Sequence, residues 1–329
     1  MLMAAGLGTR LRPFSERLAK PLVPVLGVPC AQFAIDLLVE AGVQTIVANV
    51  HHLPDSTRQG LESLDLGGAR LVVSDESSEL LGSAGGIRKA LAHLEGGPFF
   101  IANADVLCSL DWAALGRRHQ LLKKKWGVGL TLALMPISKD AKEDYREIRL
   151  DEQSERIVGL GTRSRSGLMY VGCAVVEPEL FRNLSPEKTL EFVPEILEPA
   201  IRSGVAGAYV MPPQDSWLWL DVGSPHLWWR AHMELMERLE TAGVPRVWRH
   251  RIERVAVRRG PMIWTGRELA RRLDLSDSAG PLYWGASGIG KLNPKGPIRL
   301  DSGSVIYGEP CPQARGSGIS AMGFWAQVP

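Results

Sequence analysis

The sequence predicts an α/β protein with a Rossmann-like, doubly wound mixed sheet, followed by a small, mostly β module. Three observations lead to this fold class. Apolar, β-branched runs alternate with helical patterns up to about residue 240, a glycine loop directly follows the first run, and the remaining residues are dense in Gly and Pro. We therefore expect a first domain over residues 1–240 and a second over 241–329.

The first strand is expected at the N-terminus, in "MLMAA", because a glycine loop follows it at once. Further buried strands are expected at 44–50, 69–76, 97–107 and 127–137. Helices are expected between them, at 29–42, 56–64, 84–94 and 111–125. Asp111 is placed to cap the last of these helices, since its carboxylate can accept a free backbone N–H. This regular alternation is typical of βαβ units.

The pattern changes after Tyr145. Residues 146–160 resemble a hairpin, and a long strand is expected in 167–181. A helix is expected at 189–204 and a longer one at 224–240, with strands at 206–212 and 216–223. Beyond them, short apolar runs separated by turn residues predict only short strands.

Composition limits the function classes. The net charge is only +2, which argues against a nucleic-acid partner or a membrane surface, so any anion site must come from local charge placement. The four cysteines form no CxxC pair, which disfavours zinc and disulfide scaffolds and fits a reducing cytosol. No apolar run is long enough to span a bilayer, and no signal peptide is visible, so we expect a cytoplasmic protein.

The opening loop, "AAGLGTRLRP", admits three chemistries. A dinucleotide fold needs a third glycine where Leu11 stands, and the second strand lacks the terminal acid that would bind a ribose. The loop also lacks the Lys and Ser or Thr of a P-loop. The third option is a loop whose backbone N–H groups face a nucleoside triphosphate while Arg10, Arg12 and Lys20 neutralise its charge. The residues favour this third option.

The same loop, read on to "KPLVPVLGVP", resembles the signature of the sugar-1-phosphate nucleotidylyltransferases, the nucleotide-sugar pyrophosphorylases. Three later segments resemble the same family and occur in its order: "LLGSAGGI", "IANADVL" and "WLDVGSP". The resemblance covers roughly residues 1–240 and fades beyond. It implies the nucleotide-diphospho-sugar transferase type of sheet, with a catalytic nucleotidyltransferase domain before the β module.

The implied reaction joins a nucleoside triphosphate to a sugar 1-phosphate and releases pyrophosphate. The resemblance makes Asp105 and Asp221 ligands of Mg²⁺, the expected cofactor, which prefers carboxylate and other oxygen ligands. It assigns Arg10 to the leaving phosphates and Lys20 to the α-phosphate and the incoming sugar phosphate, which makes all four residues catalytic. The expected nucleotide-binding residues are Ala5, Gly6, Gly8, Thr9, Gly82, Ser83 and Gly85.

The departures from the family pattern fall on the sugar side. Several relatives carry a Glu-x-Lys-Pro-like segment where this chain reads "GLGTRSRSG", and relatives often have Tyr-Gly where it has Tyr145-Arg146. We expect Tyr145, Gly172 and Arg163 on this side, with Arg163 or Arg165 in the place of the missing lysine. The base and sugar stay open at this point.

"LLGSAGG" resembles the mannose-1-phosphate guanylyltransferases, which we take as the first expectation. "NADVLCSLDW" equally resembles the N-acetylmuramate-1-phosphate uridylyltransferases of cell-wall recycling, so uridylyl transfer to that or another hexose 1-phosphate is the alternative. Either would make nucleotide sugars for cell-envelope polysaccharide. A non-catalytic regulatory or scaffold relative that binds nucleotide sugars is the rival of another class. The sequence leaves homo-oligomerisation open.

Overall fold

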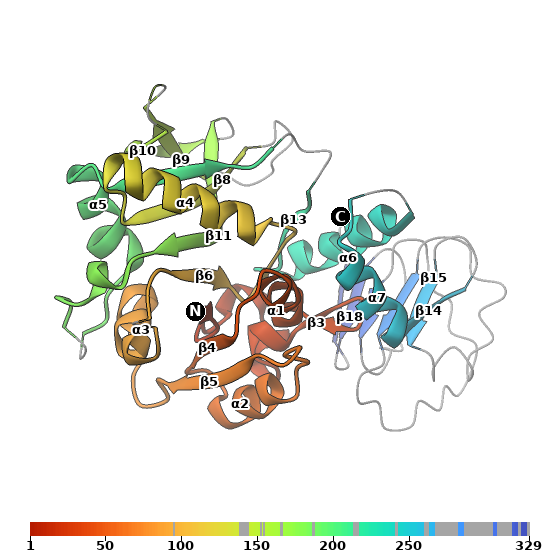
Figure 1. Ribbon diagram of the computed structural model, residues 1–329. Helices are drawn as coiled ribbons and strands as arrows, with labels where there is room; N and C mark the ends of the chain where they lie inside the picture. Colours follow the sequence, from red (N-terminus) through yellow and green to blue (C-terminus); the bar gives the residue numbers. More distant parts are fainter. Residues whose placement is uncertain are drawn as a thin grey trace. The chain divides into compact units, whose positions relative to one another are not determined.

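The computed structural model describes two compact units, each built from several stretches of the chain (Figure 1). The first unit comprises Met1–Gly6, Leu37–Ala104 and Leu110–Gln214. The second comprises Leu7–Asp36, Asp105–Ser109 and Asp215–Pro329. The residues described are 1–94, 96–137, 145–151, 153, 155–164, 167–185, 188–212, 217–240, 243–259, 263–266, 282–285, 305–307, 318–321 and 324–327.

The first unit contains a nine-stranded mixed sheet. The strands run in the order β10-β9-β11-β6-β1-β4-β5, and β8 joins the sheet by pairing with both β11 and β12. β1 is parallel to β4 and β6, and β4 to β5, whereas β11 is antiparallel to β6, β8 and β9. Their bounds are β1 Leu2–Met3, β4 Thr45–Val50, β5 Arg70–Asp75, β6 Phe99–Asn103, β8 Leu130–Pro136, β9 Tyr145–Leu150, β10 Ile157–Ser164, β11 Leu168–Val176 and β12 Ala206–Val210.

Helices connect these strands much as the alternation predicts. Their bounds are α2 Pro54–Glu62, α3 Gly82–Ala90, α4 Trp112–Trp126 and α5 Glu198–Arg202, with short turns η4 Leu91–His93, η5 Pro178–Phe181 and η6 Val193–Leu197. Asp111 caps α4, because its carboxylate accepts the Ala114 N–H at 2.8 Å. The single helix expected at 189–204 is instead a π-helical turn, η6, that continues into the short α5.

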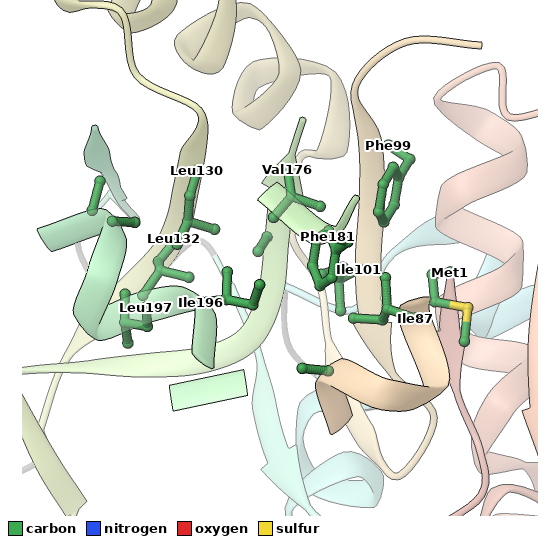
Figure 2. Close-up of a cluster of buried hydrophobic side chains, with 14 of the residues drawn as sticks. Met1, Ile87, Phe99, Ile101, Leu130, Leu132, Val176, Phe181, Ile196 and Leu197 are labelled. Carbon is green, nitrogen blue, oxygen red and sulfur yellow. The ribbon is translucent and has the colours of Figure 1, made fainter. Parts of the chain in front are cut away.

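A large hydrophobic cluster of the first unit lies between the sheet and α3, η5, η6 and α5 (Figure 2). Leu130, Leu132 and Ile101 project from the strands, and Phe99 meets Phe181 with ring centroids 6.0 Å apart. Each fully buried side chain of this size stabilises the fold by about 1.5–3 kcal/mol.

The second unit gathers the opening loop, a two-stranded ribbon and the C-terminal elements. Its elements before residue 256 are η1 Thr9–Leu11, η2 Phe14–Glu16, η3 Lys20–Leu22, β2 Pro24–Val25, β3 Val28–Pro29, β7 Val106–Cys108, β13 Trp219–Asp221, α6 Pro225–Glu240 and α7 Arg246–Val255. Helix α1 (Cys30–Glu40) begins in this unit. Two buried tryptophans tie the helices to the N-terminal segment: Trp228 donates to Pro24 O at 2.7 Å and Trp248 to Phe33 O at 2.8 Å.

Among the described residues after α7, six short strands form one sheet in chain order. They are β14 Ala256–Arg259, β15 Ile263–Gly266, β16 Leu282–Gly285, β17 Val305–Tyr307, β18 Gly318–Ala321 and β19 Phe324–Gln327. The four central strands pair in parallel, and only the two end pairs are antiparallel. The turn-rich sequence indicated short strands, but it indicated neither this parallel order nor helix α7. Among the described residues, no helix is both long and apolar enough to cross a membrane.

Candidate active site

The opening loop leaves β1 in the first unit through Ala4, Ala5 and Gly6. Ala4 and Ala5 are buried, whereas Gly6 is exposed. A Cβ placed on Gly6 would meet no atom within 4 Å, so nothing in the fold itself requires a glycine there. The open space beside its backbone suits a bound group.

The loop continues in the second unit with a tight bend at Gly8. Its φ of +62° is a conformation that side chains disfavour. A Cβ there would lie 3.1 Å from the Cβ of Ser15, whose hydroxyl donates to Gly8 O at 2.7 Å. Gly8 is therefore required by the bend, and the bend leaves the side chains of Thr9 and Arg10 exposed on η1.

Lys20 and Asp105 meet in the second unit, although 85 residues separate them in the chain. The Lys20 ammonium donates to Asp105 Oδ2, and the two side chains are 12% and 23% exposed. Lys20 opens the short turn η3, and Asp105 comes two residues after the end of β6 and directly before β7. Because both side chains are largely buried, water screens their charges less than it would at the surface.

Asp221 is brought beside Asp105 by the ribbon of β7 and β13. Asp221 pairs with Val106 across the ribbon, and the Val222 N–H donates to Asp105 O at 3.1 Å. The two carboxylates therefore come from adjacent strand ends. Both side chains are partly exposed.

Gly223 links Asp221 to Arg10. A Cβ on Gly223 would lie 2.9 Å from Asp221 Oδ1 and 3.0 Å from Arg10 Nη2, so the carboxylate and the guanidinium both lie against this glycine. Sequence reasoning did not select Gly223. The signal for it was the glycine two residues after a strand-end acid, in "LDVGSP".

Cys30 lies beneath the same cluster. Burial raises the pKa of its thiol, the charges of Asp105 and Asp221 raise it further, and the charge of Lys20 opposes them. The thiol is fully buried and stays protonated, which makes it a packing residue under the site.

Two carboxylates that can bind a metal ion and two cationic side chains suit a site that binds phosphate groups. Asp105 and Asp221 offer hard oxygen ligands, and magnesium commonly takes only one or two carboxylates, completing its shell with water and substrate phosphate. Within the described part of the chain, no cluster of three or more His, Cys, Asp or Glu side chains could hold a metal. The donor set thus fits Mg²⁺ shared with a phosphate and does not fit a closed structural metal site.

The second glycine segment lies in the first unit and packs against the chain's own residues 188–191. A Cβ on Gly82 would lie 2.6 Å from Leu190 O, and one on Gly85 would lie 2.8 Å from Lys188 O. Leu190 O also accepts the backbone N–H of Ala84 at 2.8 Å. Close packing against this backbone therefore explains why both positions are glycine. The sequence alone did not indicate this contact.

Ser83 is engaged in the same contact. Its hydroxyl donates to Glu191 Oε2 at 2.6 Å and accepts the Phe192 N–H at 2.8 Å. The segment before η6 thus anchors the start of α3. The nucleotide-binding role expected for Gly82, Ser83 and Gly85 stays a prediction.

The three sugar-side residues lie on neighbouring strands of the first sheet. Tyr145 opens β9 and pairs with Ser164, and Arg163 pairs with Arg146 from β10. Gly172 lies at an irregularity of β11, where a Cβ would come 2.9 Å from Asn103 Nδ2. The strands share one sheet, and the sugar-side role of these residues stays a prediction.

Comparisons with known proteins agree with this chemistry. The family model described as Nucleotidyl transferase matches residues 1–238. An N-acetylmuramate alpha-1-phosphate uridylyltransferase of Caulobacter vibrioides is 32% identical over 247 residues, covering 72% of this chain and 96% of that protein. A probable mannose-1-phosphate guanylyltransferase of Oryza sativa subsp. japonica is 26% identical over 236 residues, covering 68% and 61%.

Solved structures share the fold. HddC from Yersinia pseudotuberculosis, in complex with GMP-PN, superposes with a TM-score of 0.57 at 21% identity, covering 71% of this chain and 97% of that one. A UDP-glucose pyrophosphorylase complexed with UDP-glucose gives a TM-score of 0.58 at 18% identity, covering 72% and 97%.

Proposed function

The chain belongs to the nucleotidyl transferase family, and we propose that the cluster of Arg10, Lys20, Asp105 and Asp221 carries its reaction. The chain is a sugar-1-phosphate nucleotidylyltransferase, and the nucleotide-diphospho-sugar transferase fold expected from the sequence is confirmed. A phosphate oxygen of the sugar 1-phosphate attacks the α-phosphorus of a nucleoside triphosphate. The bond to the β-phosphate breaks, and pyrophosphate leaves.

The observation that carries the proposal is the meeting of Lys20 with Asp105, beside Asp221 and Arg10. Transfer at phosphorus needs positioning and charge neutralisation more than covalent chemistry. We assign Lys20 to the α-phosphate and the incoming sugar phosphate, and Arg10 to the leaving phosphates. No general base is required, because a phosphate monoester is already ionised near neutral pH.

Asp105 and Asp221 are the residues that we propose to hold Mg²⁺. When bound, the ion would neutralise charge on the triphosphate and polarise its oxygens. The chain's own part is to present two carboxylates from adjacent strand ends and to keep Lys20 within reach of one of them.

Nucleotide contacts are proposed for each unit separately. In the first unit they are Ala5, Gly6, Gly82, Ser83 and Gly85, and in the second Gly8 and Thr9. The open space beside Gly6 supports close approach of a ligand to the backbone. Gly8 contributes by shaping the bend that exposes Thr9.

For the substrates, we favour uridylyl transfer to an N-acylated hexose 1-phosphate such as N-acetylmuramate 1-phosphate. The uridylyltransferase relative has the higher identity, 32% against 26%, and is matched over more of its length, 96% against 61%. Guanylyl transfer to mannose 1-phosphate, the first expectation from "LLGSAGG", is the second candidate. Tyr145, Gly172 and Arg163 stay the proposed sugar-side residues.

A cytoplasmic site of action and a role in cell-envelope polysaccharide synthesis complete the proposal. The cytoplasmic site is supported by the substrate class, since nucleoside triphosphates and sugar phosphates are cytoplasmic metabolites. The polysaccharide role is supported by the sugars named for the relatives, N-acetylmuramate and mannose. The regulatory rival would need no catalytic cluster, and the presence of all four charged residues in one unit disfavours it.

The test is a pyrophosphate-release assay with magnesium that crosses GTP, UTP, CTP, ATP and dTTP with mannose, glucose, N-acetylglucosamine, N-acetylmuramate and heptose 1-phosphates. We expect one strongly preferred pair containing UTP. A preferred pair of GTP and mannose 1-phosphate would replace the favoured substrate and keep the reaction. Triphosphate binding without release across the whole grid would support the regulatory rival.

A further inference from the structure

A chain of hydrogen bonds between buried polar groups runs through the first unit from Ala4 to the start of α3. The Ala4 N–H donates to Asn49 Oδ1 at 2.8 Å, and Asn49 Nδ2 donates to Glu76 Oε1 at 2.8 Å. Asn49 is 1% exposed and Glu76 is fully buried. These residues sit at the carboxyl ends of β1, β4 and β5, three neighbouring parallel strands, where α/β sheets bind their ligands.

The second oxygen of Glu76 continues the chain of bonds. Glu76 Oε2 accepts the Leu81 N–H at 3.4 Å, and Leu81 directly precedes Gly82 at the start of α3. The imidazole Nδ1 of His51 faces Glu76 O at 2.7 Å and holds the same turn. Within the first unit, Ala4 and the second glycine segment are thus joined through two side chains, Asn49 and Glu76.

The hydrogen-bond directions are determined by the backbone. Only the oxygen of the Asn49 amide can accept the Ala4 N–H, so its NH₂ group must face Glu76. Both Glu76 oxygens face donors, which is the pattern of an ionised carboxylate. Burial raises the pKa of Glu76, and the bonds from Asn49 and Leu81 and the charges of Lys89 and His51 oppose that rise.

A contribution to stability does not by itself explain why Asn49 and Glu76 are buried here. A fully buried carboxylate loses its hydration, and apolar residues of similar size commonly fill such a place at no cost in stability. A satisfied buried network instead holds one geometry, because any displacement leaves a polar group without a partner. The energetic argument therefore indicates a requirement for precise placement.

Gly86 shows which element is being placed. A Cβ on Gly86 would lie 2.5 Å from Glu76 Oε1 and 2.7 Å from Asn49 Nδ2, so α3 rests directly on the pair. Gly86 has no positive φ, so contact with the pair is the reason for a glycine here. These contacts, together with the bond from Ala4 to Asn49, therefore fix the position of α3 relative to Ala4.

We propose that Asn49 and Glu76 are positioning residues that set the spacing between the backbone at Ala4–Gly6 and the second glycine segment, and so the affinity for the nucleoside triphosphate. The inference rests on the proposed function, because it takes both segments as nucleotide contacts. Neither residue needs to touch the nucleotide itself.

A reciprocal exchange tests the proposal. In Glu76→Gln, one amide NH₂ always faces another donor, and in Asn49→Asp two carboxylates face each other. In the double variant, the new carboxylate at position 49 accepts from Ala4 and from the new amide at position 76. The carbonyl of that amide accepts from Leu81, so every bond is restored. The matched control is Glu177→Gln, a buried carboxylate of the same unit that is bonded to His119 of α4 at 3.0 Å.

The readouts are the dissociation constant of the preferred triphosphate by equilibrium titration, the separate KM values for triphosphate and sugar phosphate, kcat, and the urea midpoint. We expect each single variant to weaken triphosphate binding about tenfold, with kcat and the sugar-phosphate KM within threefold of wild type. The double variant should return within threefold of wild type. The control should lose stability and keep its triphosphate affinity.

Three results would overturn the inference: single variants that bind triphosphate as wild type does, a double variant no better than the singles, or a control equally impaired in binding. These failures are distinct from failure of the proposed function. If the wild-type chain binds none of the five triphosphates, the proposed function fails and the inference falls with it.

Discussion

The ammonium of Lys20 and the carboxylate of Asp105 form an ion pair at the start of the β7–β13 ribbon. This pair brings the lysine of the opening loop to the acid that ends the "IANAD" segment. Asp221 lies on the neighbouring strand of the ribbon. The Asp221 carboxylate and the Arg10 guanidinium both lie against Gly223.

Removing the Lys20 charge should slow nucleotidyl transfer. We expect Lys20→Met to lower kcat/KM for pyrophosphate release by about 100-fold or more, because one fixed charge on a developing phosphate charge has that effect. Lys20→Arg should recover only part of the rate, since a planar guanidinium does not replace a point charge. Lys124→Met is the control, because Lys124 is exposed on α4 and belongs to no proposed site. Equal losses in Lys20→Met and Lys124→Met would argue against the assignment.

Much of this arrangement was predictable from the sequence. Strand and helix alternation gave the sheet of the first unit, because periodicity reports burial directly. The resemblance pointed to Lys20, Asp105 and Asp221, and strand-end acids are conspicuous in an apolar context. Tertiary contacts were not predictable: Gly223 owes its identity to Arg10 and Asp221, which come from different parts of the chain.

The second glycine segment shows the same limit. The resemblance placed Gly82 and Gly85 among the nucleotide-binding residues, whereas the structure gives both a reason in the backbone of residues 188–190. Gly86, which the sequence did not single out, contacts Glu76. A cluster of glycines indicates that another group packs closely against the backbone, but it does not show whether that group is a ligand or another part of the chain.

The two glycines of the opening loop should respond differently to alanine. Gly6→Ala should leave the free energy of unfolding within about 0.5 kcal/mol of wild type, because its methyl group meets no protein atom within 4 Å. The same methyl should raise the triphosphate KM about tenfold if a nucleotide fills that space. Gly8→Ala should cost about 1–2 kcal/mol, since its φ is +62°. Urea unfolding and KM measurements separate the two effects, and an unchanged KM in Gly6→Ala would remove Gly6 from the site.

Gly223→Ala should damage the site and spare the fold. The new methyl would displace the Asp221 carboxylate, 2.9 Å away, and the Arg10 guanidinium, 3.0 Å away. We expect pyrophosphate release to fall by about 10–100-fold. Gly96→Ala is the control, because a Cβ there meets no atom within 4 Å. Wild-type activity in Gly223→Ala would mean that Asp221 and Arg10 need not hold these positions.

His232 should make stability pH-dependent. Burial lowers its pKa to about 4, with the hydrogen bond to Trp228 O partly opposing. Because the unfolded imidazole titrates near 6.5, the unfolded state binds the proton first, and stability falls as the pH drops below about 6.5. The loss between pH 6.5 and 5 should be about 2 kcal/mol.

Urea unfolding of His232→Gln should show a shallower loss of stability over that range. His250→Gln, which changes an exposed histidine, should keep the wild-type pH dependence. If both variants and the wild type lose stability in parallel between pH 7 and 5, His232 is not the group responsible.

The most direct test of the central claim is magnesium-dependent pyrophosphate release by Asp105→Asn and Asp221→Asn, with Glu16→Gln as the exposed carboxylate control. The account predicts that both aspartate variants fold with wild-type cooperativity and lose at least about 100-fold in kcat/KM. Both should also lose binding of Mn²⁺, used as a spectroscopic substitute for Mg²⁺, while Glu16→Gln keeps activity and metal. Wild-type turnover in either aspartate variant would contradict the account.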